Sequence, residues 1–429
     1  MEQSSNETAE HLEGEQPEGT SSSIWTWVLT LFGTAVGAGL LFLPISAGSF
    51  GFWPLAIMTI LIGPIVFISH RTYSRIITVS GTTGMDILEV VTYLTGRKRG
   101  LVVALLYWLA NYPTLVIYCI SVTNTVDSFI TNQLHGPDLS RPVVAVLCVG
   151  TVTAAAAFGL KPMLAFANML VYPLIVSLLA FSLFLIPKWD PGSFTSYPAE
   201  HSLPVALILM LPVLVFSFSH MGAISQLAID VQRSHPENME KRVSRTDAIA
   251  VTLLVAFTMF FVWSCALAMG ADGLTQAKNE NLPVLSYFAN TTGSGFLTYL
   301  APLVTMCAIA TSFFGIMLGT EEATTYPFRV VFPETMEKIN PRVISLSFAA
   351  FVFVTGTLIT IMNPPIMGLI SFIGGVIFAL LVNMLPLALF MKVKRLRPYA
   401  KRPETIVAFI IGVILVATTV TTTLLGISA

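Results

Sequence analysis

Apolar stretches of roughly 20 residues recur along this chain, and they restrict its fold more than any other feature, because each can cross a bilayer as one helix. Eleven such stretches are present, at roughly 24–45, 52–70, 101–125, 142–159, 163–187, 203–231, 247–270, 296–320, 343–362, 366–391 and 406–427. With 55% hydrophobic and only 10% charged residues, the composition excludes a water-soluble surface. The sequence therefore predicts an all-α polytopic membrane protein with 11 transmembrane helices.

The basic residues predict how the chain is oriented. An odd number of spans places the two termini on opposite sides, and with a cytoplasmic N-terminus 19 of the 22 Lys and Arg residues fall in cytoplasmic segments. Only Arg141, Lys188 and Lys278 fall outside. Under the positive-inside rule, this asymmetry indicates a cytoplasmic N-terminus and an external C-terminus. Residues 1–23 contain six glutamates and no Lys or Arg, and they are predicted to form a disordered cytoplasmic tail.

The first span has three glycines in the seven residues from Gly33 to Gly39. Glycine costs about 1 kcal/mol relative to alanine in a helix interior, so this span is predicted to break into two half-helices near the membrane centre. The free N–H groups of the second half can hold a carboxylate, and the carbonyls that end the first half can hold a cation. Close helix packing is the alternative, since Gly33 and Gly37 also form a GxxxG pair.

The sixth span carries a similar interruption. It runs from Leu203 to Val231, which is too long for one straight crossing, and its centre reads FSFSHMG from Phe216 to Gly222. The serines and His220 are polar groups that need partners inside a bilayer. Interrupted spans one and six, in two sets of five, are typical of an inverted-repeat transporter. A kink stabilised by serine hydrogen bonds to the preceding turn is the alternative for span six alone.

This pattern predicts three regions along the chain. The N-terminal tail is followed by a transporter core at residues 24–391, which consists of a first repeat at 24–187 and a second repeat at 203–391. The eleventh helix, at 406–427, lies outside the repeat.

Spans eight and three supply further candidate ligands. Ala308, Thr311 and Ser312 stand at i, i+3 and i+4, so one helix face presents a carbonyl and two hydroxyls, the hard oxygen ligands that a small cation needs. Tyr118, deep in span three, is placed to reach a central site with its hydroxyl. Packing within the membrane remains the alternative for all four residues.

Ionisable residues are nearly absent from the spans, which limits where a proton relay can lie. The candidates at depth are His220 and the helix-end residues Asp230, Glu321 and Glu322, whereas His70, beside Arg71, is expected at the cytoplasmic interface. No HExxH motif, paired intramembrane Asp or Ser-His-Asp set is apparent, which argues against a membrane-embedded enzyme. No filter-like repeat or ring-forming acidic motif favours a channel. A receptor without transport activity stays open.

Several motifs together resemble one family. They are LFGTAVGAGLLFLP from Leu31 to Pro44, PVLVFSFSH from Pro212 to His220, FVWSC from Phe261 to Cys265, LSYFAN from Leu285 to Asn290 and SFFG from Ser312 to Gly315. In this order they resemble the bacterial hydroxy/aromatic amino acid permease family, and within it the serine and threonine permeases. That family belongs to the amino acid–polyamine–organocation superfamily. The resemblance implies a 5+5 inverted repeat similar to that of the sodium-coupled leucine transporter, with broken helices 1 and 6 and one extra helix.

The resemblance also implies a substrate site. The substrate's carboxylate is expected on the N–H groups of Gly37, Ala38 and Gly39, and its amino group on carbonyls near Phe216, Ser217 and Ser219. Phe218 is expected to be an aromatic wall or gate. The full set of predicted substrate-binding residues is Thr34, Ala35, Gly37, Ala38, Gly39, Tyr118, Phe216, Ser217, Phe218 and Ser219.

A sodium site is implied at carbonyls of Gly33, Val36 and Ala308 and at the hydroxyls of Thr311 and Ser312. This sequence differs from the family at Thr311. At that position the proton-coupled serine permeases carry a lysine, whose ammonium group is expected to take the place of the cation. The leucine-type fold has another sodium site, in which an amide side chain binds the ion. This chain has Leu40 at that position, so no sodium is expected there.

The resulting hypothesis is a secondary active symporter in the bacterial inner membrane that imports a small L-amino acid, serine or threonine, by alternating access. It is expected to be a monomer that uses no cofactor and binds no nucleic acid, with sodium as the coupling ion. Proton coupling and an aromatic amino acid substrate remain the alternatives.

Overall fold

The computed structural model describes residues 23–157, 160–192, 201–291 and 295–425, and these residues form helices joined by turns and loops. The longer helices are α1 (Ile24–Ala35), α2 (Ala38–Gly48), α3 (Phe52–Thr78), α5 (Arg97–Ser128), α6 (Arg141–Ala157), α7 (Leu160–Leu185), α9 (Leu203–Phe218), α10 (Met221–Ser234), α11 (Met239–Asn279), α13 (Gly295–Val331), α15 (Pro341–Met362) and α19 (Pro403–Leu425). The tenth predicted span is continuous from Ile366 to Lys392 and consists of α16 (Ile366–Phe372), the π-helical segment η4 (Ile373–Met384) and α17 (Leu385–Lys392). The shorter helices include α4 (Ile87–Thr95), α12 (Val284–Thr291), α14 (Pro333–Lys338) and α18 (Arg397–Ala400).

Every predicted span coincides with a helix or a pair of helices. Within the described ranges, seven helices are long and apolar enough to cross a membrane, and the number is nine when each of two bent pairs is taken as one span. Two shorter apolar helices, Arg141–Ala156 and Tyr172–Lys188, lie where the fourth and fifth spans are predicted. The all-helical class is therefore confirmed, and the count of eleven stays a prediction. The predicted cytoplasmic tail lies outside the described residues, apart from Ser23.

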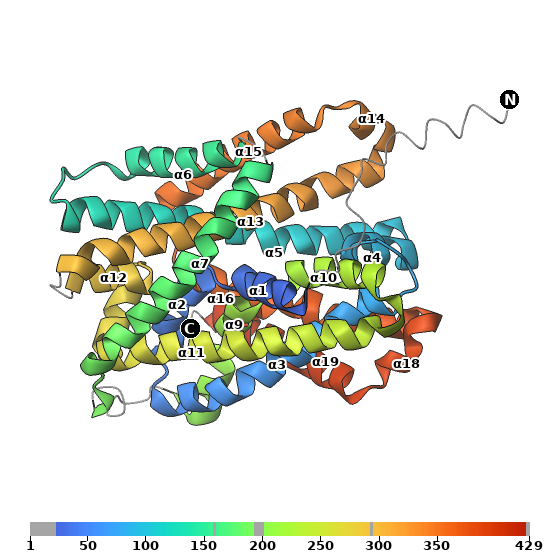
Figure 1. Cartoon of the computed structure of the whole chain (residues 1–429), viewed down its shortest axis with the longest axis horizontal. Coiled ribbons are helices and arrows are strands. Elements are labelled where there is room, and N and C mark those ends of the chain that lie inside the picture. Colours follow the sequence, from blue (N-terminus) through green and yellow to red (C-terminus); the bar gives the residue numbers. More distant parts are fainter. Residues whose placement is uncertain (1–22, 158–159, 193–200, 292–294, 426–429) are drawn as a thin grey trace.

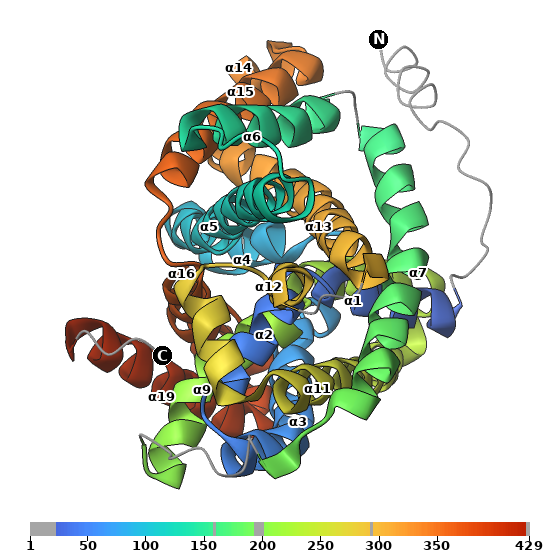
Figure 2. The same cartoon turned by 90° about the vertical axis from the view of Figure 1, so that its left-hand side faces the viewer.

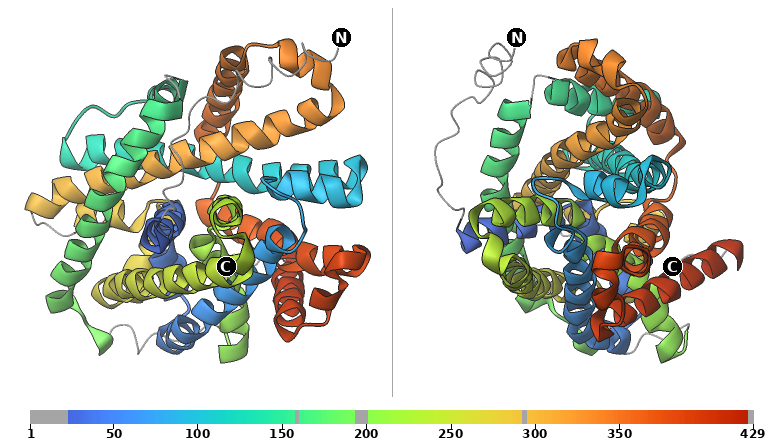
Figure 3. Two further views of the ribbon diagram at one scale, coloured as in Figure 1. Left: turned by 45° about the vertical axis from the view of Figure 1, so that its right-hand side comes forward. Right: turned by 90° about the vertical axis from the view of Figure 1, so that its right-hand side faces the viewer.

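The long helices α3, α5, α11 and α13 run roughly along the longest axis of the molecule, whereas α7 crosses them (Figure 1). The short helices α4, α14 and α18 lie at one end of the molecule, and α12 lies at the other. Viewed along the helices, α1 and α2 lie in the interior, whereas α6, α15 and α19 lie at the periphery (Figure 2). The helices α13 to α15 and the C-terminal helices lie on opposite sides of the molecule (Figure 3).

The first predicted break is present between α1 and α2, which are bent by 61° relative to each other. Val36 (φ −75°, ψ 95°) and Gly37 (φ −153°, ψ −150°) are extended there, so the helical hydrogen bonding of α1 ends with the Val36 N–H, which donates to the Phe32 carbonyl at 3.1 Å. The first amides of a helix have no partner within it. The break therefore leaves N–H groups free at the start of α2, as the glycines predict.

The second predicted break separates α9 from α10, which are bent by 47°. Ser219 (φ −75°, ψ 130°) is extended, and His220 (φ −129°, ψ 33°) occupies the position just before α10. The two breaks are in contact, because the Ser217 hydroxyl donates a hydrogen bond to the Gly39 carbonyl at 3.0 Å. A β-carbon on Gly39 would lie 2.8 Å from the Ser217 Cα, so only glycine allows this close approach.

The helix α11 extends beyond the predicted seventh span at both ends. It begins at Met239, and it is interrupted at Gly270, whose φ of +63° lies in a region that glycine adopts without strain. The predicted end of this span at residue 270 coincides with the interruption. The N-terminal extension of two turns carries Asp247 into the helix interior, which the apolar pattern does not indicate.

Candidate functional site

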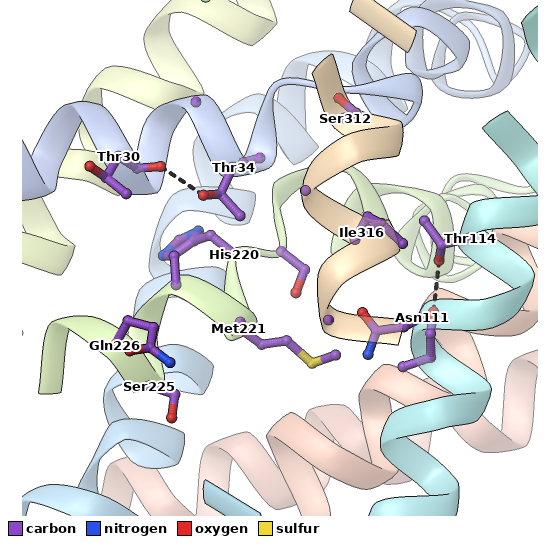
Figure 4. Close-up of a pocket in the computed structure, with 18 of the residues that line it drawn as sticks. Thr30, Thr34, Asn111, Thr114, His220, Met221, Ser225, Gln226, Ser312 and Ile316 are labelled. Atoms are coloured by element: carbon purple, nitrogen blue, oxygen red, sulfur yellow. Dashed lines mark hydrogen bonds between the residues drawn. The ribbon is translucent and has the colours of Figure 1, made fainter. Parts of the chain in front are cut away.

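A cavity of about 780 Å³ lies at the meeting point of the two broken helix pairs. This volume falls within the range of small-molecule binding pockets. Figure 4 shows that Thr30 and Thr34 reach it from α1, Asn111 and Thr114 from α5, and Ser312 and Ile316 from α13. His220, Met221, Ser225 and Gln226 line it from the α9–α10 break and from α10. These labelled residues come from four parts of the sequence, and the segment before α4, α4, α7 and η4 contribute further residues to the lining.

Most of the predicted substrate residues line this cavity or contact a residue that does. Those in the lining are Thr34, Ala35, Gly39, Tyr118, Phe216 and Ser219. Gly37 is held close to the lining, because a β-carbon there would lie 2.6 Å from the Ser312 Oγ and 2.9 Å from the Tyr118 hydroxyl. Ala38 is the first residue of α2, so its amide belongs to the free first turn.

Two predicted substrate residues have a different environment. Ser217 is buried, and its hydroxyl is bonded to the Gly39 carbonyl. Phe218 is fully buried and is not part of the cavity lining in the described structure. The neighbouring Phe216 supplies the aromatic wall instead, and it stacks on Phe378 of η4 with ring centroids 5.7 Å apart.

The five predicted cation ligands come from the end of α1 and from α13, and one contact joins the two groups. The Ser312 hydroxyl is 3.4 Å from the Val36 carbonyl, and the Thr311 hydroxyl donates to the Ala308 carbonyl at 2.9 Å. Gly33, Thr311 and Ser312 also line the cavity. Oxygen atoms from both helices are thus brought together at the first break. In the described residues, no group of three or more His, Cys, Asp or Glu side chains is placed to hold a metal ion.

The cavity continues from the breaks toward one end of the molecule. It is lined there by Trp25 at the start of α1, Asp86 before α4, and Glu322 near the end of α13. This is the end at which α4 and α14 lie, and it is the end to which the basic segments are predicted to belong.

The opposite end is held together by polar side chains. Arg141 donates to the Asn124 side chain at 2.9 Å, and Asn124 donates to the Asn281 carbonyl at 2.9 Å. Asn281 in turn donates to the Asn363 side chain at 3.0 Å. These bonds join α5, the start of α6, the segment before α12 and the end of α15.

Some lining residues and one buried cluster escaped the sequence analysis. Asn111 and Gln226 line the cavity, yet single polar residues in a span give no specific signal. His70, which was predicted at the cytoplasmic interface, is buried in the protein with 3% of its surface exposed, because α3 continues to Thr78 past the apolar window. Asp247 is buried for a similar reason, and both lie beside His220.

Two broken helix pairs around a shared cavity define a multi-pass membrane protein with an internal binding site. Sequence comparison matches residues 20–424 to the tryptophan/tyrosine permease family. The serine transporter SdaC of Escherichia coli is 33% identical over 397 residues, which cover 91% of this chain and 92% of that protein. The threonine/serine transporters TdcC of Escherichia fergusonii and Yersinia enterocolitica are each 34% identical, covering 91% of this chain and 94% and 93% of theirs.

The chain belongs to the tryptophan/tyrosine permease family. This confirms the resemblance inferred from the motifs, and it makes the protein a member of a transporter family and not an enzyme.

Proposed function

We propose that this protein is a secondary active symporter that imports serine or threonine across the bacterial inner membrane by alternating access. The observation that carries the proposal is the contact between the two helix breaks, through Ser217 and Gly39, beside the cavity. The names of the relatives supply the substrate class. The N-terminus is cytoplasmic and the C-terminus external, and the two sets of five spans form an inverted repeat.

The broken helices recognise the groups that all amino acids share. The positive end of the α2 dipole and its free amides bind the substrate carboxylate. Carbonyls at the C-terminal end of α9, from Phe216 to Ser219, bind the amino group. Tyr118 and Ser312, which lie against Gly37, border the same position. Since no charged side chain is needed, the site stays neutral when empty and avoids the cost of a buried unpaired charge.

The state of the transporter follows from the two ends of the cavity. Its extension to Trp25, Asp86 and Glu322 leads to the predicted cytoplasmic side, and the hydrogen bonds of Asn124, Arg141 and Asn281 close the other side. The described conformation is therefore assigned as inward-open. Import then requires the external bonds to break in the outward-open state.

The full chain, reconstituted in liposomes that contain unlabelled serine, is expected to show saturable uptake of labelled serine by counterflow. A panel of competing amino acids then defines the substrate. Threonine is expected to compete, and tryptophan and tyrosine are not. Competition by tryptophan and tyrosine but not by threonine would assign the protein to aromatic amino acid transport. Absence of counterflow with serine, threonine, tryptophan and tyrosine alike would reject transport.

We further propose that sodium binds between α1 and α13, at Gly33, Val36, Ala308, Thr311 and Ser312. The support is the approach of the Ser312 hydroxyl to the Val36 carbonyl across the break. Carbonyl and hydroxyl oxygens are the ligands that hard cations prefer. A cation there holds α1 against α13 and stabilises the outward-open state.

Thr311→Ala is expected to raise the sodium concentration for half-maximal uptake by roughly tenfold, because it removes one oxygen ligand to a charged group. Thr305→Ala is the matched control, since Thr305 is also a buried α13 threonine bonded to the preceding turn, through the Ala301 carbonyl at 2.9 Å. The measurement is serine uptake at varied sodium, with choline as the replacement. Uptake that is unaffected by choline in the unmodified protein would remove sodium from the mechanism.

A further inference from the structure

Three ionisable side chains meet at the α9–α10 break, away from the proposed sodium ligands. His220 lies in the break, His70 comes from α3 and Asp247 from α11, and each is at most 3% exposed. The two imidazole rings are stacked, with centroids 4.1 Å apart and an angle of 9° between the ring planes. The hydrogen bonds of this cluster determine where its protons lie.

His70 is neutral and has a defined tautomer. The backbone N–H of His220 points at its Nε2, at 3.2 Å, and an N–H can only donate, so this nitrogen carries no proton. The proton of His70 is therefore on Nδ1, from which it is donated to the Val66 carbonyl at 2.9 Å. His70 thus positions the break by accepting a backbone hydrogen bond, and it has no free nitrogen with which to exchange a proton.

His220 has oxygen atoms at both ring nitrogens. Its Nδ1 lies 3.1 Å from the Phe218 carbonyl, which can only accept, so Nδ1 is protonated. Its Nε2 lies 2.8 Å from Oδ1 of Asp247. A hydrogen bond there requires one further proton, either on the imidazole beside a carboxylate or on the carboxyl beside a neutral imidazole. In both arrangements the pair is neutral overall.

Loss of that proton is incompatible with the described geometry. Two lone pairs would face each other at 2.8 Å, and a buried negative charge would remain on Asp247. The second carboxyl oxygen of Asp247 has no hydrogen-bond partner among the described residues, so no further hydrogen bond there compensates this charge. Deprotonation must therefore move His220, which is part of the break itself.

The charged surroundings of the pair are sparse. Arg71 of α3 is the charged side chain beside Asp247, and its Nε is also buried without a hydrogen-bond partner in the part of the chain described. The sequences of α1, α2 and α9 contain no ionisable side chain. On α10, Asp230 and Arg233 lie near the far end, and on α11 the charges from Glu240 to Arg245 precede Asp247 toward the helix N-terminus. The proton between His220 and Asp247 is thus the group that responds to pH at this break.

We propose that His220 and Asp247 form a proton-binding site that is coupled to the shape of the α9–α10 break. The pair takes one proton from water on the external side, carries it with the amino acid, and releases it to water on the cytoplasmic side as the break rearranges. The inference rests on the amino acid transport proposed above but not on sodium coupling, because the pair and the α1–α13 oxygens are separate sets of residues.

Asp247→Asn tests the proposal, since asparagine keeps the shape and a hydrogen bond to His220 but cannot lose a proton. In liposomes, the unmodified protein is expected to move protons inward with serine and to accumulate serine when the interior is alkaline. The variant is expected to lose both while retaining serine counterflow, which needs no net proton movement. Asp230→Asn is the control, because this carboxylate bonds the Trp27 indole at 2.6 Å and should leave proton movement unchanged.

Two results would overturn the proposal. One is net serine uptake by the unmodified protein without any accompanying proton movement, which would leave amino acid transport standing. The other is proton-driven accumulation by Asp247→Asn at the unmodified level. Should the variant not fold, nitrogen NMR of histidine-labelled full-length protein gives a second measurement, with His70→Gln and His220→Gln for assignment. A proton on Nε2 of His70, or none on Nδ1 of His220, would contradict the hydrogen-bond assignment.

Discussion

Replacing Gly39 by alanine is expected to reduce serine counterflow by about 100-fold or more. The added methyl group would lie 2.8 Å from the Ser217 Cα and 3.3 Å from a ring carbon of Phe216. A backbone atom cannot move aside without shifting its helix, so α2 and α9 must separate at the proposed substrate site. A displacement of about 1 Å in a binding geometry can cost 10²-fold in rate. Labelled serine uptake by the reconstituted variant measures the effect.

Gly315→Ala provides the control for this experiment. Gly315 also lines the cavity, from α13, but a β-carbon there meets no atom within 4 Å. The same methyl addition is therefore expected to leave uptake close to that of the unmodified protein. Normal transport by Gly39→Ala would show that the contact between the two breaks is not needed, and the proposed function would lose its main support.

The largest expected effect on stability comes from Arg75, whose side chain is fully buried. Its guanidinium binds Glu240 at 2.8 Å and Glu404 at 2.9 Å, which joins α3 to α11 and α19. Removing one partner from a buried ion pair costs about 3–5 kcal/mol when the remaining charge is fully buried. Glu240 and Glu404 are 31% and 24% exposed, which places this case at the lower end of that range. Arg75→Ala is therefore expected to lower the melting temperature of the detergent-purified protein markedly, or to prevent its accumulation in the membrane.

Arg402→Ala separates this effect from the loss of a positive charge in general. Arg402 also binds Glu240, but at 3.4 Å and with 41% of its side chain exposed. Exposed ion pairs contribute about 0–1 kcal/mol, so this variant is expected to melt close to the unmodified protein. Equal melting temperatures for the two variants would mean that the buried network does not stabilise the helix bundle.

The positions of the helices could be predicted well from sequence alone. A bilayer-spanning helix needs about 20 apolar residues, and this requirement is local, so every predicted span coincides with a helix. The breaks were also predictable, because the glycines around Gly37 and the serines around Ser219 weaken a helix wherever it packs. The ends were less predictable, since helices such as α3 and α11 continue past their apolar windows when their polar residues find partners in the protein.

The candidate site was predictable only in part. Thr34, Gly39 and Phe216 were expected at the site and line the cavity, because they adjoin the breaks. Asn111 gave no specific signal in the sequence, and the packing of α5 against the breaks brings it to the cavity. Phe218 was expected to be an aromatic wall or gate, but in the described structure it is buried and Phe216 lines the cavity.

By itself, the sequence determined the membrane class of this protein, its family and the two places where helices break, because hydropathy, glycine content and motif order are properties of contiguous residues. Only the tertiary structure decided that His70, His220 and Asp247 are joined by hydrogen bonds. These residues stand far apart in the chain. The direction of each hydrogen bond depends on the atoms that α3, the α9–α10 break and α11 place opposite one another.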